Sequence, residues 1–499
     1  MRFLEIDELP HFQFQKDFLR PFEHVIQNTS NVTVKDMILQ CLNQMIKARA
    51  DKIKSGWRTM FGVFTYAAKE KYGACLVRSS STYVLESIVS FGFENVKMIY
   101  KTKFSVVIAQ GSFADLIVCL TETAKNNQFQ RISFQALDAL KATIPNMLAC
   151  PECPLSSKYS PAKKATSTNQ THDDPMVKFW YPILFAFHDV IMTGEDLEVR
   201  QRALDVLFGT LESYGGSYSS DFWDIVCRKI LFPIFGVLRA RPDDSRFNDE
   251  ELSVWLSTTM IKALRGLIEL FTHYFKTLER MLDMLLELLV SCICQGIPLS
   301  MISSLQENDT LAKIGSSCLQ QLILENVRSL EQKHWAKISN TFVQLFETTT
   351  AYTLFNPESM DNPTTDGTQN ALRINGIATD EDPAGDQIAS DHLGIDENGR
   401  DLENFKLNQE VQPSVTAARK REFKQIIVKC VLQLLMIETV SELLASDEVY
   451  ESMPSEQLLA LMQVLRKSYR FARKFNNNRE LRMNLLRIGN AYPREEVAD

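Results

Sequence analysis

Apolar residues recur along this chain at the spacing of an amphipathic helix. From Val34, further apolar residues fall at i+3, i+4, i+7, i+8, i+11 and i+12, the last at Ile46, and form one continuous face. Thr33 is the residue expected to cap this helix, with Asp36 three positions on. Only 19 of the 499 residues are glycine, which suits long helices better than a turn-rich β-fold.

A second pattern indicates how the helices assemble. In Asp196–Leu207, and more loosely in Asn308–Leu319, an acidic or amide residue is followed by an apolar periodic segment that resembles the second helix of a HEAT-type repeat. Each helix pair exposes an apolar face that it cannot bury alone, so neighbouring pairs stack. The expected fold is therefore all-α, an armadillo/HEAT-like α-solenoid with a long acidic disordered insert. The copies are unevenly spaced, so the sequence does not demonstrate a regular period.

Two segments without periodicity divide the array. Residues 150–175 are rich in Ser, Thr, Pro and Lys and predict a flexible linker, and residues 356–416 are acidic and polar and predict a disordered insert. The remaining spans are predicted as helical-repeat regions 1–149 and 176–355, C-terminal helical hairpins 417–488, and a tail 489–499.

The net charge of −8 is concentrated in one place. Between Asn356 and Val411 there are thirteen Asp/Glu against three Lys/Arg, so the rest of the chain carries about +2 and gives no case for nucleic-acid binding.

The longest apolar run, Met281–Cys294, contains two carboxylates and is too short to span a bilayer. The first nine residues lack an apolar signal core. The cysteines lie mostly in apolar periodic segments, which indicates reduced thiols and a cytoplasmic location.

No set of residues predicts chemistry. Cys150 and Cys153 have the spacing of half a zinc site, but zinc needs four ligands and His172 is the nearest further candidate. Two free thiols at the edge of the linker are the simpler interpretation. His188 and His273 lie in apolar helical contexts and are predicted to be satisfied, partly buried side chains. Neither catalytic residues, nor a cofactor, nor a metal site is expected.

One helix near the C-terminus carries a candidate contact surface. Four cationic residues are predicted to share one helical stripe: Arg466, Arg470, Arg473 and Lys474. Leu465, Tyr469 and Ala472 are expected on the other side of this helix. Such a stripe can contact anionic lipid headgroups or an acidic protein surface. The alternative is a solvated outer face.

The middle of the chain is dense in aromatic residues. Core packing is the default expectation for them, although a solenoid ridge can expose a few as a partner-binding groove. They include Phe179, Trp180, Phe185, Phe222, Trp223, Phe232 and Phe235. If one patch binds a partner, the ridge of the helices in 221–270 is expected first, and the basic stripe second.

Ten short stretches carry a resemblance to a known family. They are Phe14–Glu23, Ile53–Trp57, Leu197–Arg200, Ala203–Leu204, Asp221–Asp224, Leu231–Phe235, Leu252–Thr259, Asn308–Leu311, Ile314–Gln321 and Gln425–Val431. In this order they are similar to the C-terminal half of the large, brefeldin A-inhibited guanine-nucleotide exchange factors for Arf GTPases, the trans-Golgi proteins whose yeast member named the "Sec seven" exchange domain.

The resemblance implies a regulatory scaffold downstream of the exchange domain. In the family, these regions contribute to membrane recruitment, to autoinhibition and its relief by activated small GTPases of the Arf and Rab classes, and to dimerisation. A location at trans-Golgi membranes and a homodimer are thus implied. Exchange belongs to a separate domain with a glutamate finger, whose signature resembles no stretch here. No catalytic residue can be carried over, and the chain is expected not to be an enzyme.

Three departures from the family pattern accompany this resemblance. The chain begins at a position internal to family members, which suggests a fragment, a split gene or an incomplete gene model. Residues 296–306 interrupt a continuous family segment and are either a surface loop or a splicing artefact. The tail from Gly489 leaves the pattern. A stand-alone HEAT/armadillo-type adaptor remains the alternative function, and intrinsic exchange activity is the alternative expected to fail.

Overall fold

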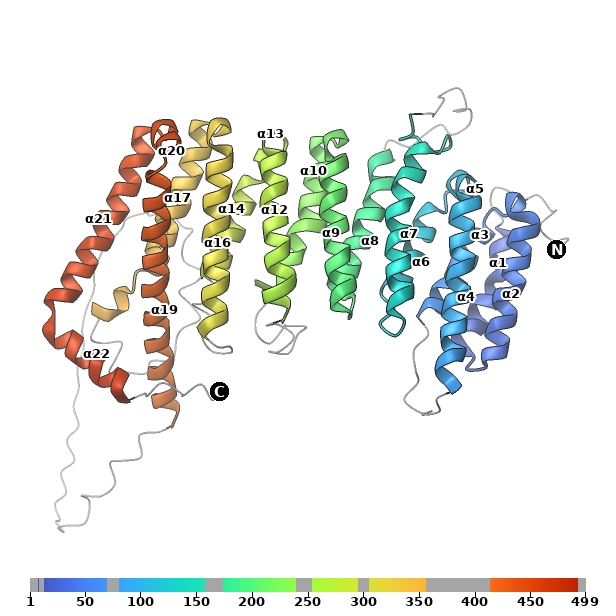
Figure 1. The fold of residues 1–499 in the computed structure, drawn as a ribbon, viewed down its shortest axis with the longest axis horizontal. Helices are drawn as coiled ribbons and strands as arrows, with labels where there is room; N and C mark the ends of the chain where they lie inside the picture. The colour runs from blue at the N-terminus through green and yellow to red at the C-terminus, as the bar shows by residue number, and fades with distance from the viewer. Residues whose placement is uncertain are drawn as a thin grey trace, which may run out of the picture.

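The computed structural model describes residue 8 and residues 13–69, 80–157, 174–238, 254–294, 305–355 and 413–491. In these ranges all regular structure is helical. The helices stand side by side in one elongated row, from α1 at one end to α21 and α22 at the other (Figure 1). The prediction of an all-α solenoid is confirmed.

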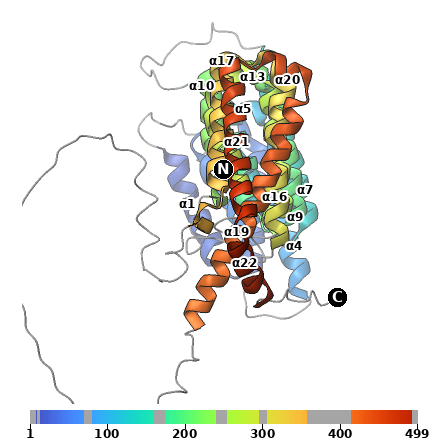
Figure 2. The same ribbon diagram turned by 90° about the vertical axis from the view of Figure 1, so that its left-hand side faces the viewer.

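The helices form two layers, each a stack of successive neighbours (Figure 2). One layer contains α1 (Phe14–Asn28), α3 (Gly56–Ala68), α6 (Phe113–Ala124), α8 (Tyr181–Thr193), α10 (Ser220–Val226), α14 (Leu282–Cys294), α17 (Gln332–Thr349) and α21 (Ser455–Asn477). The other contains α2 (Val32–Arg49), α4 (Ser80–Thr102), α7 (Gln130–Ala149), α9 (Leu197–Tyr214), α12 (Ile261–His273), α16 (Leu305–Asn326) and α19 (Pro413–Leu444). The core lies between the layers, so each helix buries one face against the opposite layer.

Shorter elements connect these helices or extend their ends. The α-helical ones are α5 (Phe104–Ala109), α13 (Phe275–Leu278), α20 (Asp447–Ser452) and α22 (Arg479–Ala491). Turns of 3₁₀ helix are η2 (Ala50–Lys52), η5 (Gly215–Ser217), η7 (Phe232–Leu238), η10 (Glu279–Met281), η11 (Val327–Ser329) and η12 (Tyr352–Phe355), and π-helical turns are η4 (Met176–Trp180), η6 (Cys227–Leu231) and η9 (Trp255–Met260). None of the described helices is long and apolar enough to cross a bilayer.

Two helix starts show how local sequence begins these elements. Asn31, in extended backbone, caps α2: its side-chain oxygen accepts hydrogen bonds from the N–H groups of Thr33 and Val34 at 2.9 and 3.3 Å. The expectation that Thr33 caps this helix is therefore wrong, because the side chain of Asn31, two residues earlier, accepts from the free N–H groups at the helix start. Asp196 caps α9 by accepting from the N–H of Val199 at 3.0 Å.

Polar contacts between stacked helices show how many residues separate neighbouring repeats along the sequence. Lys125 contacts Asp189 at 2.8 Å across 64 residues of sequence, whereas Lys337 contacts Asp283 at 2.7 Å across only 54. The unit length therefore varies along the chain. Connecting segments of different length explain why equal stacking in space leaves no equal spacing in sequence.

The structure also places the predicted boundaries. Residues 150–157, at the start of the predicted linker, form a run of turns, and residues 158–173 lie outside the described part. Residues 356–412 of the predicted insert and residues 295–304, which hold most of 296–306, lie outside it too. Helix α19 begins at Pro413, inside the span assigned to the insert, and α22 runs to Ala491, past the predicted start of the tail.

Candidate functional site

The aromatic residues of the middle block are mostly core. All five tryptophans of the chain are buried, as are Phe222 and Phe235. Phe185, on α8, is an exception, because its ring is exposed on the outer side of the helix. Among the described residues of 221–270, Val254 alone is a large exposed apolar side chain. The ridge expected first as a partner surface therefore offers no apolar patch in that part of the chain.

Two of the stretches that carry the family resemblance, Phe14–Glu23 and Ile53–Trp57, contact each other. The buried Gln15 amide donates to the carbonyl of Lys52 at 2.9 Å and accepts from the N–H of Lys54 at 2.8 Å. The Ser55 hydroxyl donates to Glu8 at 2.5 Å. Burial alone would raise the pKa of Glu8, but hydrogen bonds from Ser55 and the Gln15 N–H outweigh it and lower the pKa. These contacts fasten the start of α3 to α1.

Another such stretch, Leu197–Arg200, joins two repeats. Arg200 donates from Nη2 to the carbonyl of Gly194 at 2.8 Å, and its guanidinium lies 4.9 Å from the ring centre of Trp255. Burial lowers the pKa of Arg200. Arg200 thus connects α9 to η9, and its role there is structural.

The cysteine pair offers no reactive thiol. Cys150 and Cys153 are free but buried, and burial raises the pKa of Cys150 to about 11 and also raises that of Cys153. Thiolates, which bind metals and react, are therefore disfavoured here at neutral pH. Within the described ranges, no group of three or more His, Cys, Asp or Glu side chains could hold a metal ion. His172 lies outside those ranges.

The two singled-out histidines differ from each other. His188 is buried, and burial lowers its pKa, but its Nδ1 has no hydrogen-bond partner among the described residues. His273 is exposed and packs edge-on against Tyr274, with ring centres 4.5 Å apart. The expectation of a partly buried imidazole is thus wrong for His273, whereas His188 is buried and has a backbone hydrogen bond with Ile230 beside its unpaired Nδ1. Helical periodicity does not reveal which polar atoms reach a partner.

The predicted basic stripe lies on α21, at the C-terminal end of the array (Figures 1 and 2). Arg466, Arg470 and Arg473 are exposed and form no ion pair with any described residue. Lys474 differs, because its Nζ lies 4.2 Å from the ring centre of Phe355 in η12. Three of the four predicted residues therefore face outward together, while the fourth makes a cation–π contact within the molecule.

Apolar side chains share this outward face. Leu459, Met462 and Tyr469 are 62, 54 and 65% exposed, and their spacing from Arg466 and Arg473 is that of one helix face. The placement of Tyr469 on the side opposite the arginines is therefore wrong. The buried side of α21 is formed instead by Leu461, Val464 and Ser468, with Phe471 partly buried. Leu459 and Met462 are functional candidates that sequence reasoning missed. The sequence did contain a signal for them: Leu459 and Met462 lie seven and four residues before Arg466, a spacing that puts them on the same helix face as the arginines.

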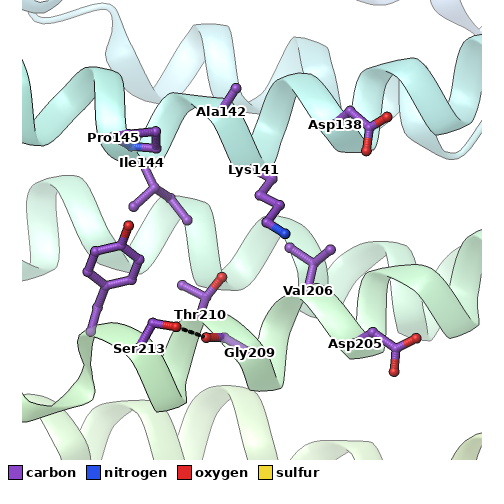
Figure 3. A pocket seen from close by; sticks show the side chains of 11 residues that line it. Asp138, Lys141, Ala142, Ile144, Pro145, Asp205, Val206, Gly209, Thr210 and Ser213 are labelled. Carbon is purple, nitrogen blue, oxygen red and sulfur yellow. Dashed lines mark hydrogen bonds between the residues drawn. The ribbon is translucent and has the colours of Figure 1, made fainter.

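A hollow on the other layer is the second candidate surface. It has a volume of about 690 Å³ and lies between α7 and α9. Ile144 and Val206 contribute apolar walls, and Lys141 reaches from α7 toward Val206 (Figure 3). A Cβ added to Gly209 would meet nothing within 4 Å, so this wall is open. Charged rims, apolar walls and an open side suit contact with a protein surface.

Comparison with known proteins relates the sequence of this chain to a family. A model described as Mon2/Sec7/BIG1-like, HDS, matches residues 2–85, and one described as the BIG2 C-terminal domain matches residues 431–496. The ADP-ribosylation factor guanine nucleotide-exchange factor SEC7 of Saccharomyces cerevisiae is 37% identical over 97% of this chain and 25% of its own length. The ADP-ribosylation factor guanine nucleotide-exchange factor sec72 of Schizosaccharomyces pombe is 35% identical over 98% of this chain and 24% of its own length.

A mammalian relative shows the same coverage. Brefeldin A-inhibited guanine nucleotide-exchange protein 1 of Homo sapiens is 28% identical over 98% of this chain and 27% of its own length. The chain thus spans about a quarter of the length of these relatives. Its described residues form an all-α stack of helical repeats. The predicted resemblance is confirmed: the chain corresponds to a part of the large Arf guanine-nucleotide exchange factors that lies outside their catalytic domain.

Proposed function

We propose that this chain is a non-catalytic regulatory and scaffolding region of a large Arf guanine-nucleotide exchange factor in Golgi vesicle-mediated transport. It contributes to membrane recruitment, to autoinhibition, and to binding of activated small GTPases of the Arf and Rab classes. It acts from the cytoplasm, peripherally at trans-Golgi membranes. The observation that carries this proposal is that nearly the whole chain is similar to these exchange factors, while its described residues form a continuous helical stack.

The stack supports a scaffolding role on physical grounds. Repeats in a solenoid contact mainly their neighbours, so the array holds distant surfaces at set positions. The hollow between α7 and α9 and the outward face of α21 lie far apart along it (Figure 1). A partner bound at one surface and a membrane at another can therefore be held at once. Regulation further requires that a partner bind one state of the exchange factor more tightly than the other.

The α7–α9 hollow is the surface that we assign to an activated GTPase. Arf and Rab proteins, each loaded with GDP or with a GTP analogue, would be titrated against the full chain in solution without lipid. Binding of at least one GTPase that depends on the GTP analogue supports the proposal. Absence of nucleotide-dependent binding to every one of them contradicts it.

A matched pair of glycine variants locates the contact. Gly209→Phe fills the α7–α9 hollow without a backbone clash, because no atom lies within 4 Å of the new Cβ. Gly236→Phe is the control, since Gly236 has equally open surroundings and lines a different hollow, beside η7. We expect only the first variant to weaken GTPase binding. Equal loss in both would place the contact elsewhere.

Exchange activity is a separate matter. The chain alone is proposed not to release nucleotide from Arf, because it corresponds to regions outside the catalytic domain. Fluorescent-nucleotide release from Arf measures this directly, with a catalytic domain as positive control. Release above the spontaneous rate would contradict a purely regulatory role. The predicted homodimer is tested by sedimentation of the full chain over a range of concentrations.

A further inference from the structure

The last two helices of the array expose apolar and cationic side chains together. On α21, six residues share the outward face: Leu459, Met462, Arg466, Tyr469, Arg470 and Arg473. The outward faces of solenoid helices normally carry polar residues, because water and not another helix covers them. Here three large apolar side chains, each more than half exposed, take positions where polar residues would be expected.

Helix α22 repeats this arrangement independently. Leu481 and Leu485 turn inward and pack in the small cluster that includes Phe471 and Phe475 of α21. Arg479, Arg482, Met483 and Leu486 then fall on the opposite side at i, i+3, i+4 and i+7. Met483 is 45% and Leu486 58% exposed, and both arginines are exposed. Helices α21 and α22 lie at one end of the row of helices (Figure 2), and each has a face that mixes exposed apolar and cationic side chains.

We propose that these two outward faces, together the terminal face, lie on an anionic phospholipid bilayer. This inference rests on the peripheral-membrane part of the proposed function and names the surface and the lipid chemistry. A helix at a bilayer surface buries its apolar side chains into the headgroup and acyl boundary, while basic residues bind anionic headgroups. Arginine stems and tyrosine rings suit this boundary because each has an apolar body and a polar end.

Charge distinguishes a bilayer from a second copy of this chain. Helix α21 has Glu456 as its one carboxylate, in the first turn, against five cationic residues. Of these five, Lys467 approaches Glu347 at 3.8 Å and Lys474 contacts Phe355, which leaves the three arginines for the outward face. Two terminal faces brought together would oppose arginines to arginines, which is unfavourable. An anionic lipid surface complements them instead.

Flotation of the full chain with vesicles tests the electrostatic part. Vesicles of phosphatidylcholine alone are compared with a phosphatidylcholine–phosphatidylserine mixture. We expect binding to the mixture only, weakened by salt. Each cationic side chain near an anionic bilayer strengthens binding about fivefold, so the triple variant Arg466→Gln, Arg470→Gln, Arg473→Gln should bind about 100-fold more weakly. The control Lys262→Gln, Arg280→Gln, Lys333→Gln removes the same charge from the middle of the array and should bind normally.

Quenching by brominated lipids tests the apolar part. All five native tryptophans are buried, so they are shielded from contact with lipid. The variant Met462→Trp adds an exposed reporter to the terminal face, and we expect brominated acyl chains to quench its fluorescence. Lys262→Trp, on α12, is the matched control and should not be quenched. Circular dichroism and thermal midpoints confirm that all variants are folded.

Four results would overturn the inference. They are equal binding to neutral and anionic vesicles, normal binding by the triple arginine variant, no quenching of the tryptophan at 462, or a chain that ignores vesicles but forms a dimer broken by the arginine changes. The last result would assign the terminal face to a second copy. GTPase binding in lipid-free solution is measured on the same variants. A wild-type chain that binds a GTPase but no anionic vesicle rejects only this inference, whereas a wild-type chain that binds neither rejects the proposed function as well.

Discussion

The middle of the array and its C-terminal end are built from similar amphipathic helices but treat large apolar side chains differently. Around α8–α17, Trp180, Trp223, Trp255 and Trp335 are buried. On α21, Leu459 and Met462 are more than half exposed. An inner helix has a neighbour on each side in its layer, whereas among the described helices α21 has a layer neighbour, α17, on one side only. The position of a helix in the stack therefore decides whether an apolar residue is core or surface.

The largest expected effect on the free energy of unfolding comes from a residue in the middle of the array. Trp223 is fully packed: its indole donates to the Gly215 carbonyl at 3.1 Å and its ring lies 5.4 Å from those of Tyr218 and Tyr274. Trp223→Ala should lower the free energy of unfolding by about 3–5 kcal/mol, because it removes transfer energy and leaves a cavity. Chemical denaturation followed by circular dichroism measures this. A loss below about 1 kcal/mol would mean that inner helices are as loosely packed as the end.

A pair of glycines tests packing between inner helices. A Cβ on Gly266 of α12 would lie 3.0 Å from the ring of Phe208 on α9, so Gly266→Leu should cost about 1–3 kcal/mol through overpacking. Gly209, on α9, faces open space, and Gly209→Ala should instead stabilise by about 0.5–1 kcal/mol, since glycine weakens a helix. Opposite signs in thermal denaturation are expected. The same sign for both would contradict close α9–α12 packing.

An ion pair between inner helices gives a pH-dependent effect. Lys125 contacts Asp189 at 2.8 Å and Glu122 at 2.7 Å. Burial would lower the pKa of Lys125, but the hydrogen bonds to Asp189 and Glu122 outweigh it and raise the pKa. A raised lysine pKa means that this stabilisation is complete below the ordinary value of about 10.4 and is lost as the pH rises through the folded-state value.

The variant Lys125→Met measures this contribution. It should cost about 1–2 kcal/mol at pH 8, discounted because the site is partly solvated. Asp189 then loses its cationic partner, while Glu122 keeps its contact with Lys69, at 3.3 Å. The difference from wild type should shrink once the pH exceeds the ordinary lysine pKa. Thermal midpoints of both proteins across alkaline pH provide the measurement. A difference that stays constant would show that the loss comes from packing and not from charge.

The smallest effect is expected at the end. Leu459→Ser and Met462→Ser should each change the free energy of unfolding by less than about 0.5 kcal/mol, because both side chains already contact water. The double variant combines the two changes. The same denaturation experiment as for Trp223→Ala allows a direct comparison. A loss above 1 kcal/mol would show that these residues are covered within the protein, and the contrast between middle and end would fail.

Sequence reasoning succeeded where the signal is local. The period from Val34 to Ile46 predicted a helix that the structure places at Val32–Arg49, and the aromatic residues assigned to the core, such as Phe222, are buried. It failed where a residue far along the chain determines what a side chain contacts. Lys474 joined the predicted stripe by spacing alone, but Phe355 of η12 lies beneath its ammonium group. Spacing within one helix carries no information about that ring.

The outward face of α21 was predicted only in part, because only some of its features are local. The arginines of α21 were identifiable because charge and period are visible in sequence. Tyr469 was misplaced because an apolar residue was assumed to face the core. Only the tertiary structure, in which α21 packs against α17 and Leu461 and Val464 are buried, shows which side of the helix is covered.

The sequence by itself determined that this chain is all-α and stacked, because helical period, capping residues and unshared apolar faces are properties of short segments. It also determined the likeness to Arf exchange factors, through short ordered stretches. Only the tertiary structure decided the variable repeat length, the packing function of Gln15 and Arg200, and the exposure of the terminal face. Each of these depends on which distant residues meet, and burial is a property of the assembled layers.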